Sequence, residues 1–377
     1  MPNKIMPTTV KENKKTEKSE SKKSELLLDS LEIKGYRCFE HLTIEKLGRV
    51  NLIVGKNNVG KTALLEALWI YAEATSFRSL IKTLKNLLET RNEKEVSDNG
   101  QQFSKKGSKY TPLEVIELND NVGLHFRHLF NNRPQKSKAQ FFIDSGKVLP
   151  ENSSSGRNPK DRVVVDFELH RDSPLITSPN SQKHTFHDEI NNLFVKSTGL
   201  NTLLLTEIWD DVILKNEEDE AVKVLKIITS KLVDLNFINY PKGVQNRVPV
   251  VRVENIDERI PLSSLGEGMN RLLGIALALV NCKNGMLFVD EIEIGLHYSV
   301  LPDVWKLIFK TAKDLNVQVF ATTHSYDCIQ AFAEAAIEDE ESEGNLIRLA
   351  RNEDQIKAFT FDEKQLETIT KEHIEVR

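Results

Sequence analysis

Eight consecutive residues, Gly55 to Thr62, have the types and the spacing that a phosphate-binding loop needs. They fill the pattern G-x-x-x-x-G-K-[ST] without a mismatch, between the apolar run 51–54 and a helical pattern that begins at Thr62. A chain that turns from strand to helix at glycines points backbone N–H groups and the positive end of the helix dipole at one small volume. The sequence therefore predicts an anion site there, with the Lys61 ammonium on the β and γ phosphates and the Thr62 hydroxyl on Mg²⁺.

Three further polar residues follow apolar runs later in the chain. Asp290 and Glu291 come directly after the run 286–289, and His324 ends the run that starts at Val317. A buried parallel strand tolerates acids only at its carboxyl end, where α/β sheets bind ligands. We expect Asp290 to hold Mg²⁺ through its water shell, Glu291 to orient or deprotonate an attacking water, and His324 to hydrogen-bond the γ phosphate or that water.

Serines and glycines also precede a second apolar helix, expected over 272–280. Ser263 and Ser264 are followed by Gly266 and Gly268 in the serine–glycine stretch, residues 261–271, which reads P-L-S-S-L-G-E-G-M-N-R. Hydroxyl and backbone N–H donors at a positive helix end again suit phosphate, although an N-capped core helix has the same pattern. The sequence does not decide which of the two serines supplies the hydroxyl.

The composition is that of an ordinary globular protein, with 377 residues, 39% hydrophobic residues, 28% charged residues and a net charge of −5. This length allows one large domain or two modest ones. The slightly acidic total argues against a surface covered with non-specific nucleic-acid contacts, while a local basic face is compatible with it. The three cysteines form no C-x-x-C pair, and no apolar run approaches the roughly 20 residues of a membrane span. We therefore expect a cytoplasmic protein without disulfides, a zinc site or membrane contact.

The elements that must position these residues divide the chain into four parts. Residues 1–27 alternate lysine, glutamate and serine and are expected to be a disordered tail. Residues 28–90 are expected to be an N-terminal lobe, with two antiparallel strands that turn near Phe39 to His41, the phosphate loop, and a helix that continues toward Glu89. Residues 91–254 are interpreted as an insertion, and residues 255–377 as a C-terminal lobe.

The expected insertion mixes strand patterns with a helical pattern over 207–233 and carries no catalytic motif. His125 and His128 are three residues apart, but no carboxylate or cysteine ligand lies near them in sequence, so we interpret them as packing or surface residues. The acidic run 216–220 lacks the spacing of a cation site and is interpreted as a solvated junction between helices.

The order of these motifs resembles that of the ABC-type ATPases that include the SMC, RecF and OLD groups. The resemblance rests on the opening L-x-I-x-G-Y-R-x-F at residues 31–39, the loop G-x-N-x-x-G-K-T, the stretch S-L-G-E-G-M and the segment E-x-G-L-H at 293–297. It covers both ends of the chain well and the middle hardly at all. It implies an α/β P-loop NTPase with an ABC-ATPase-like mixed sheet flanked by helices and a β/helical insertion. Within this group the chain resembles an OLD-like ATPase domain without a TOPRIM nuclease domain, since the residues after His324 offer neither the room nor the motif that such a domain would need.

The resemblance also implies the roles of the site residues, with ATP as substrate and Mg²⁺ as cofactor. Glu291 and His324 are the expected catalytic residues, and Thr62 and Asp290 the expected metal ligands. Arg37 is expected to contact a phosphate, and the segment 293–297 to cross the seam of a dimer. The expected nucleotide-binding residues are Gly55, Lys56, Asn57, Asn58, Val59, Gly60, Lys61, Thr62 and Ala63. The residues expected to contact the γ phosphate of ATP held by a second subunit are Ser263, Ser264, Gly266, Glu267 and Gly268.

Three functions are compatible with these residues. The first is the ATPase or sensor component of a phage-defence or DNA-maintenance system that works with a separate effector protein, such as a nuclease or a toxin. The second is a DNA-binding recombination or repair ATPase resembling RecF and SMC heads, and the third is a nucleotide-dependent scaffold with little turnover. A homodimer or higher oligomer is implied in each case. The sequence names neither the effector nor any nucleic acid that is bound.

Overall fold

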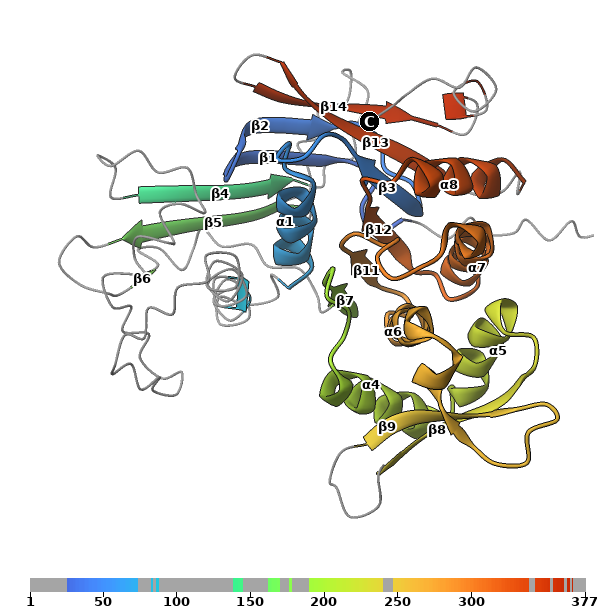
Figure 1. Ribbon diagram of the computed structural model, residues 1–377. Helices are drawn as coiled ribbons and strands as arrows, with labels where there is room; N and C mark the ends of the chain where they lie inside the picture. Colours follow the sequence, from blue (N-terminus) through green and yellow to red (C-terminus); the bar gives the residue numbers. More distant parts are fainter. Residues whose placement is uncertain are drawn as a thin grey trace, which may run out of the picture.

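The computed structural model describes residues 26–73, 83, 86–87, 138–144, 162–169, 176–177, 190–239, 247–338, 343–352, 355–362, 365–366 and 368. They form a central mixed sheet with helices on both faces, a second, antiparallel sheet beside it, and a small unit of two helices and three strands (Figure 1). Among the helices of these residues, none combines the length and the apolar character of a membrane span.

The central sheet consists of six strands, which are β3 (Val50–Val54), β7 (Asn192–Val195), β11 (Met286–Val289), β12 (Gln318–Thr322), β13 (Gly344–Asn352) and β14 (Gln355–Phe361). Their order across the sheet is β14-β13-β3-β12-β11-β7. Every neighbouring pair is parallel except β13 and β14. All residues of β3, β11 and β12 are buried, as expected for parallel strands that are covered on both faces.

Helices cover this sheet on its two faces (Figure 1). Helix α1 (Lys61–Glu73) lies on one face, and α6 (Glu267–Asn281), α7 (Leu301–Asp314) and α8 (Tyr326–Glu338) lie on the other. Successive strand residues point to opposite faces, so each strand contributes to two cores. On β11, Phe288 packs in the core that contains α1, whereas Leu287 and Val289 pack in the core of α6 to α8. The α/β class with a mixed, helix-flanked sheet is therefore confirmed.

The second sheet is antiparallel, in the order β2-β1-β4-β5-β6. Its strands are β1 (Leu31–Tyr36), β2 (Phe39–Ile44), β4 (Lys138–Asp144), β5 (Arg162–Leu169) and β6 (Ile176–Thr177). The buried side chains of β1 and β2 share one core with α1. The small unit, which packs on α6, contains α4 (Thr202–Leu214), α5 (Glu218–Ile228), β8 (Leu232–Asn239), β9 (Arg247–Val253) and β10 (Ile260–Pro261).

The range 91–254, expected as an insertion, does not form one separate unit. β7 lies inside this range, yet it pairs with β11 at the edge of the central sheet. β4 to β6 also lie inside it and extend the sheet that β1 and β2 begin. Sequence patterns did not predict this division, because the partners of a strand are chosen by long-range packing rather than by its own residues.

Some local boundaries also differ from expectation. The turn between β1 and β2 lies at Arg37 and Cys38, because Phe39 is buried in the core as the first residue of β2. Helix α1 ends at Glu73, and the described residues among those that follow, 83 and 86–87, are helical. The acidic run 216–220 joins α4 to α5, where Glu217 pairs with Lys283 at 2.8 Å. Residues 1–25 of the expected tail, together with His125 and His128, lie outside the described residues.

Candidate functional site

Four parallel strands, β3, β12, β11 and β7, end at one edge of the central sheet, and the polar residues of interest follow them directly. The phosphate loop follows β3, Asp290 and Glu291 follow β11, and His324 follows β12 after one intervening residue. Ligands bind at the carboxyl ends of the strands in open α/β sheets, since the loops there leave polar groups accessible. The separate apolar runs of the sequence thus bring their polar ends to one place.

The phosphate loop has a backbone that requires glycine at two positions. Gly55 has a φ of +146° and Gly60 a φ of +101°. A Cβ atom at Gly55 would lie 2.5 Å from the carbonyl oxygen of Leu349 on β13, and one at Gly60 would lie 2.6 Å from Cys38 Sγ. Asn58, with a φ of 61°, is of a residue type that adopts this region more readily than most. The loop is therefore fixed between β13 and the β1–β2 turn.

Lys61, the first residue of α1, reaches back across the phosphate loop. Its Nζ donates hydrogen bonds to the carbonyl oxygens of Gly55 at 2.8 Å and Lys56 at 3.2 Å. Partial burial lowers the pKa of Lys61, and nearby carboxylates oppose this shift, with Glu291 and then Asp290 having the largest effects. The ammonium and these carboxylates therefore face the same volume.

Asp290 is buried and accepts hydrogen bonds from two threonines. Thr322 Oγ1 donates to Asp290 Oδ1 at 2.7 Å, and Thr62 Oγ1 donates to the same oxygen at 3.2 Å. The hydroxyl at the start of α1 and the carboxylate at the end of β11 therefore lie side by side. Both are hard oxygen donors of the kind that Mg²⁺ prefers, so these residues fit the metal that the fold implies.

Glu291 has an unusual backbone conformation, with a φ of +49°. Its N–H donates to Thr322 Oγ1 at 2.8 Å, which fixes the turn between β11 and the residues that follow. A glutamate in the left-handed region is uncommon, and backbone strain of this kind is concentrated at functional sites. The strained turn places an acid at the strand end, facing the Lys61 ammonium.

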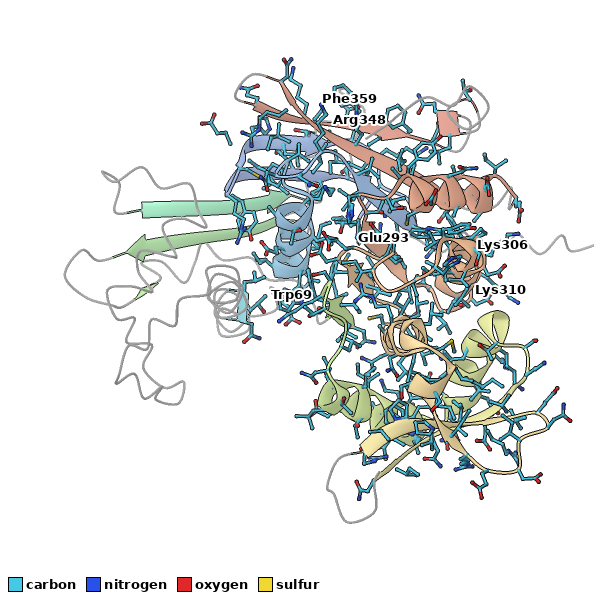
Figure 2. All side chains as sticks on the ribbon, in the orientation of Figure 1. Trp69, Glu293, Lys306, Lys310, Arg348 and Phe359 are labelled. Carbon is cyan, nitrogen blue, oxygen red and sulfur yellow. The ribbon has the colours of Figure 1, made fainter. Side chains whose placement is uncertain are left out.

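His324 lies between two carboxylates. Its Nδ1 atom is 3.2 Å from Glu293 Oε1 and 3.9 Å from Glu291 Oε1. Glu293 Oε1 also accepts the backbone N–H of His324 at 3.1 Å. The Glu293 side chain, labelled in Figure 2, is only 10% exposed, whereas the His324 side chain is 54% exposed.

Arg271, in the second turn of α6, connects that helix to two strand ends. Its Nη2 donates to the carbonyl oxygens of Asp290 at 2.9 Å and Glu291 at 3.2 Å, and its Nη1 donates to those of Lys196 and Ser197, which follow β7. Burial lowers the pKa of Arg271, and the carboxylates around it, above all Asp290, oppose this shift. One guanidinium therefore joins α6 to the loops after β7 and β11.

The serine–glycine stretch differs in detail from expectation. Helix α6 starts after Gly266, and Ser263 and Ser264 precede it in a 3-10 turn, so neither serine caps the helix. Both serines are exposed, and among the described residues neither donates a hydrogen bond to the phosphate loop of its own chain. A Cβ atom at Gly268 would lie 2.7 Å from the carbonyl oxygen of Gly295. The start of α6 is therefore in contact with the segment 293–297.

Arg37 pairs with a protein carboxylate in the described structure. Its Nε lies 3.1 Å from Oε2 of Glu66, a buried residue of α1, and the Tyr36 hydroxyl donates to the same oxygen at 3.2 Å. A buried carboxylate needs a partner, because burial removes its hydration. Arg37 therefore neutralises Glu66 between α1 and the β1–β2 turn, and its contact with a phosphate stays a prediction.

Two residues of this site, Thr322 and Arg271, were given no role in the sequence, and Glu293 was named there only as part of the segment 293–297. Arg271 had a readable signal, since an arginine inside an otherwise apolar helix must find a partner. Thr322 and Glu293 had weaker signals, because polar residues beside a strand end are common and their partners are chosen by the tertiary structure.

Comparison with known proteins adds a family to this geometry. The sequence model of the family described as "AAA domain, putative AbiEii toxin, Type IV TA system" matches residues 50–327. An ATP/GTP phosphatase of Helicobacter pylori is 24% identical over 334 residues, which cover 81% of this chain and 87% of that protein. The DNA replication and repair protein RecF of Bacillus mycoides is 27% identical over 180 residues, which cover 46% of this chain and 45% of RecF. The solved structure of an SMC head bound to the C-winged helix domain of ScpA aligns with 89% of this chain and 98% of that one, at 13% identity and a TM-score of 0.49.

Proposed function

This chain belongs to that family of AAA domains, and from this premise we propose that it is a Mg²⁺-dependent ATPase. The observation that carries the proposal is the meeting of the phosphate loop, Asp290, Glu291 and His324 at one sheet edge. The H. pylori relative, named an ATP/GTP phosphatase, supports the same reaction class.

Each residue has a role that its position supports. The loop N–H groups and the Lys61 ammonium bind the β and γ phosphates, while Thr62 and Asp290 hold Mg²⁺, which supplies positive charge to the phosphate oxygens. Glu291 orients a water for in-line attack or accepts its proton, and His324 hydrogen-bonds that water or the γ phosphate. The other nucleotide-binding residues, Gly55, Lys56, Asn57, Asn58, Val59, Gly60 and Ala63, provide the backbone around the phosphates.

We further propose that a second copy of the chain completes the site. The hydroxyl and N–H donors of the serine–glycine stretch (Ser263, Ser264, Gly266, Glu267 and Gly268) would contact the γ phosphate held by the other subunit. Both serines and Gly266 are exposed, and Tyr298, just beyond the segment 293–297, is 64% exposed. Exposed donors beside exposed apolar side chains suit a surface that is covered when ATP is bound.

A phosphate-release assay tests the reaction. The wild-type protein is expected to release phosphate from ATP with Mg²⁺, Lys61→Ala to lose nucleotide binding, and Glu291→Gln to bind ATP without turnover, since its amide cannot accept a proton. Lys310→Ala, which removes an exposed lysine of α7, is the matched control and should behave as wild type. A Glu291→Gln variant with the parent rate would show that Glu291 is not the base.

For the biological role, we propose the ATPase or sensor component of a phage-defence or DNA-maintenance system that works with a separate effector, such as a nuclease or a toxin. The description of the family, which names a "putative AbiEii toxin" of a Type IV TA system, supports a defence role. Co-purification of a nuclease or toxin with the Glu291→Gln variant, dependent on ATP, tests it.

A DNA-repair ATPase is the second candidate, favoured by the match to RecF. A gel shift that requires ATP and weakens steeply with salt would support this candidate, because neutralised phosphates release counterions. The scaffold alternative with little turnover is separated from both by the phosphate-release assay.

A further inference from the structure

One carboxylate oxygen of Glu293 contacts two nitrogen atoms of His324. One oxygen, Glu293 Oε1, accepts the backbone N–H of His324 and lies within hydrogen-bond distance of Nδ1 on the same residue, at 3.1 and 3.2 Å. The backbone hydrogen bond fixes the position of the residue, and the close contact at Nδ1 restricts the rotation of its ring. Because an ionised carboxylate only accepts hydrogen bonds, the ring nitrogen that faces it must be the one that carries the proton.

From this contact we propose that Glu293 is a positioning residue for His324, holding the neutral imidazole with its proton on Nδ1. The other nitrogen, Nε2, then carries the lone pair, which can accept a hydrogen bond from the attacking water, and the side chain that bears it is 54% exposed. The inference rests on the proposed function and selects one of its two options for His324, namely a hydrogen bond accepted from the attacking water. It assigns a task to the segment E-x-G-L-H within its own subunit.

The position of Glu291 gives Glu293 a second consequence. Glu291 Oε1 lies 3.9 Å from the same Nδ1 atom, 0.7 Å farther away than Glu293 Oε1 (3.9 against 3.2 Å). At 3.9 Å, Glu291 Oε1 is too far from Nδ1 to accept a hydrogen bond, so the Nδ1–H group points to Glu293 and the oxygens of Glu291 stay available to water. Glu293 therefore keeps the proposed base free as well as orienting the histidine.

Burial shows that Glu293 is not placed for stability. Its side chain is 10% exposed, and within the described residues its Oε2 atom is buried without a hydrogen-bond partner. A buried carboxylate with an unsatisfied oxygen is less favourable than an apolar side chain of similar size. The contact with His324 therefore gives Glu293 a role in function rather than in stability.

Nitrogen-15 NMR of the imidazoles in the nucleotide-free protein, at about pH 8 where histidines are neutral, tests the tautomer directly. The His324 signals are those that disappear in His324→Gln. The wild-type protein should carry the proton on Nδ1. Glu293→Gln, whose amide oxygen can still accept both N–H groups, should keep that tautomer, whereas Glu293→Leu should lose it. A proton on Nε2 in the wild-type protein, or an unchanged tautomer in Glu293→Leu, would overturn the proposal.

Kinetics of the same variants separate positioning from stability. Glu293→Leu should lower kcat about 10- to 100-fold with little change in KM for ATP, as expected for a residue that acts through another. Its unfolding temperature should equal or exceed that of the wild type. Glu338→Leu, which removes an exposed carboxylate that pairs with Lys306 at 2.8 Å, is the control and should leave kcat unchanged. Equal kcat values for the two leucine variants would refute the positioning role. Because the NMR measurement needs no nucleotide, it decides the tautomer even if the wild-type protein proves to have no ATPase activity.

Discussion

Lys61 shows how a single residue of this site combines opposite demands. Its ammonium is partly buried, which lowers its pKa, and it lies near three carboxylates that favour its charge. Phosphate groups bound in the loop would favour the charged form further. The proposed phosphate contact requires the protonated form of Lys61, and burial lowers the pKa at which this proton is lost.

Nucleotide affinity should depend on pH through this residue. Below the pKa of Lys61 in the folded protein the ammonium is intact and affinity should be constant, and affinity should fall as the pH rises through that value. The decline should begin below the ordinary lysine pKa of about 10.4. The dissociation constant of a fluorescent ATP analogue, measured from about pH 7 to about pH 10, tests this expectation. A constant affinity over the whole range would contradict it.

The same shift has the opposite sign for stability. The unfolded chain holds the Lys61 proton more tightly than the folded one, so this residue's contribution to the free energy of unfolding should rise with pH in the window between the two pKa values. A rise in the free energy of unfolding of the nucleotide-free protein, over the pH range in which nucleotide affinity falls, would distinguish titration of Lys61 from general unfolding at high pH.

At the scale of elements, helix α6 connects the serine–glycine stretch to the strand ends that carry Asp290 and Glu291. Its first turn follows the exposed serine–glycine stretch, and its second turn carries Arg271, which donates to carbonyl oxygens after β7 and β11. A displacement of α6 would therefore move the backbone of Asp290 and Glu291. If a second copy contacts the serine–glycine stretch and displaces α6, the backbone of Glu291, the proposed catalytic acid of the same chain, would move with it.

Arg271→Lys is expected to separate binding from turnover. Lysine keeps the charge, but its single ammonium cannot match the planar fork that reaches both loops. The loss of one or two charge-assisted hydrogen bonds corresponds to about 1–3 kcal/mol, so kcat should fall roughly 10- to 100-fold while ATP affinity changes little. Arg259→Lys, at an exposed arginine that pairs with Asp234 at 3.1 Å, is the matched control. A wild-type kcat for Arg271→Lys would show that α6 is not coupled to the acids in this way.

At the scale of the whole molecule, the proposal divides the site between two copies. The phosphate loop, the acids and His324 lie at one sheet edge of one copy, whereas the serines of the same copy are exposed and make no hydrogen bond to that loop within the described residues. This division is the physical basis for expecting ATP to hold a dimer together. It also allows two defective chains to complement each other.

A mixture of Lys61→Ala and Ser264→Arg should recover activity that neither variant has alone. Lys61→Ala keeps an intact serine–glycine stretch, and Ser264→Arg keeps an intact phosphate loop, so a mixed dimer has one complete site. Random pairing makes about half of the dimers mixed, each with one working site of two, which gives about a quarter of the wild-type rate. Absence of recovery, with both variants folded and dimer formation shown by light scattering, would argue against a shared site.

The sequence by itself determined the features that are local in the chain. The apolar runs at 51–54, 286–289 and 317–321 are confirmed as buried strands, because a strand covered on both faces has a continuous apolar pattern. The strand-to-helix turn could also be predicted from Gly55 and Gly60, because the positive φ values that it needs favour glycine. The α/β class with a helix-flanked mixed sheet followed from these elements.

Only the tertiary structure decided which residues meet. The pairing of β7 with β11, the pairing of Arg37 with Glu66, and the contacts of Thr322, Arg271 and Glu293 join residues far apart in sequence or choose one partner among several nearby. Such choices depend on burial and on the pairing of buried polar groups, which no short stretch of sequence records. An acid at the end of an apolar run predicts a ligand-binding residue at a strand end, and the packing around it decides which groups that acid contacts.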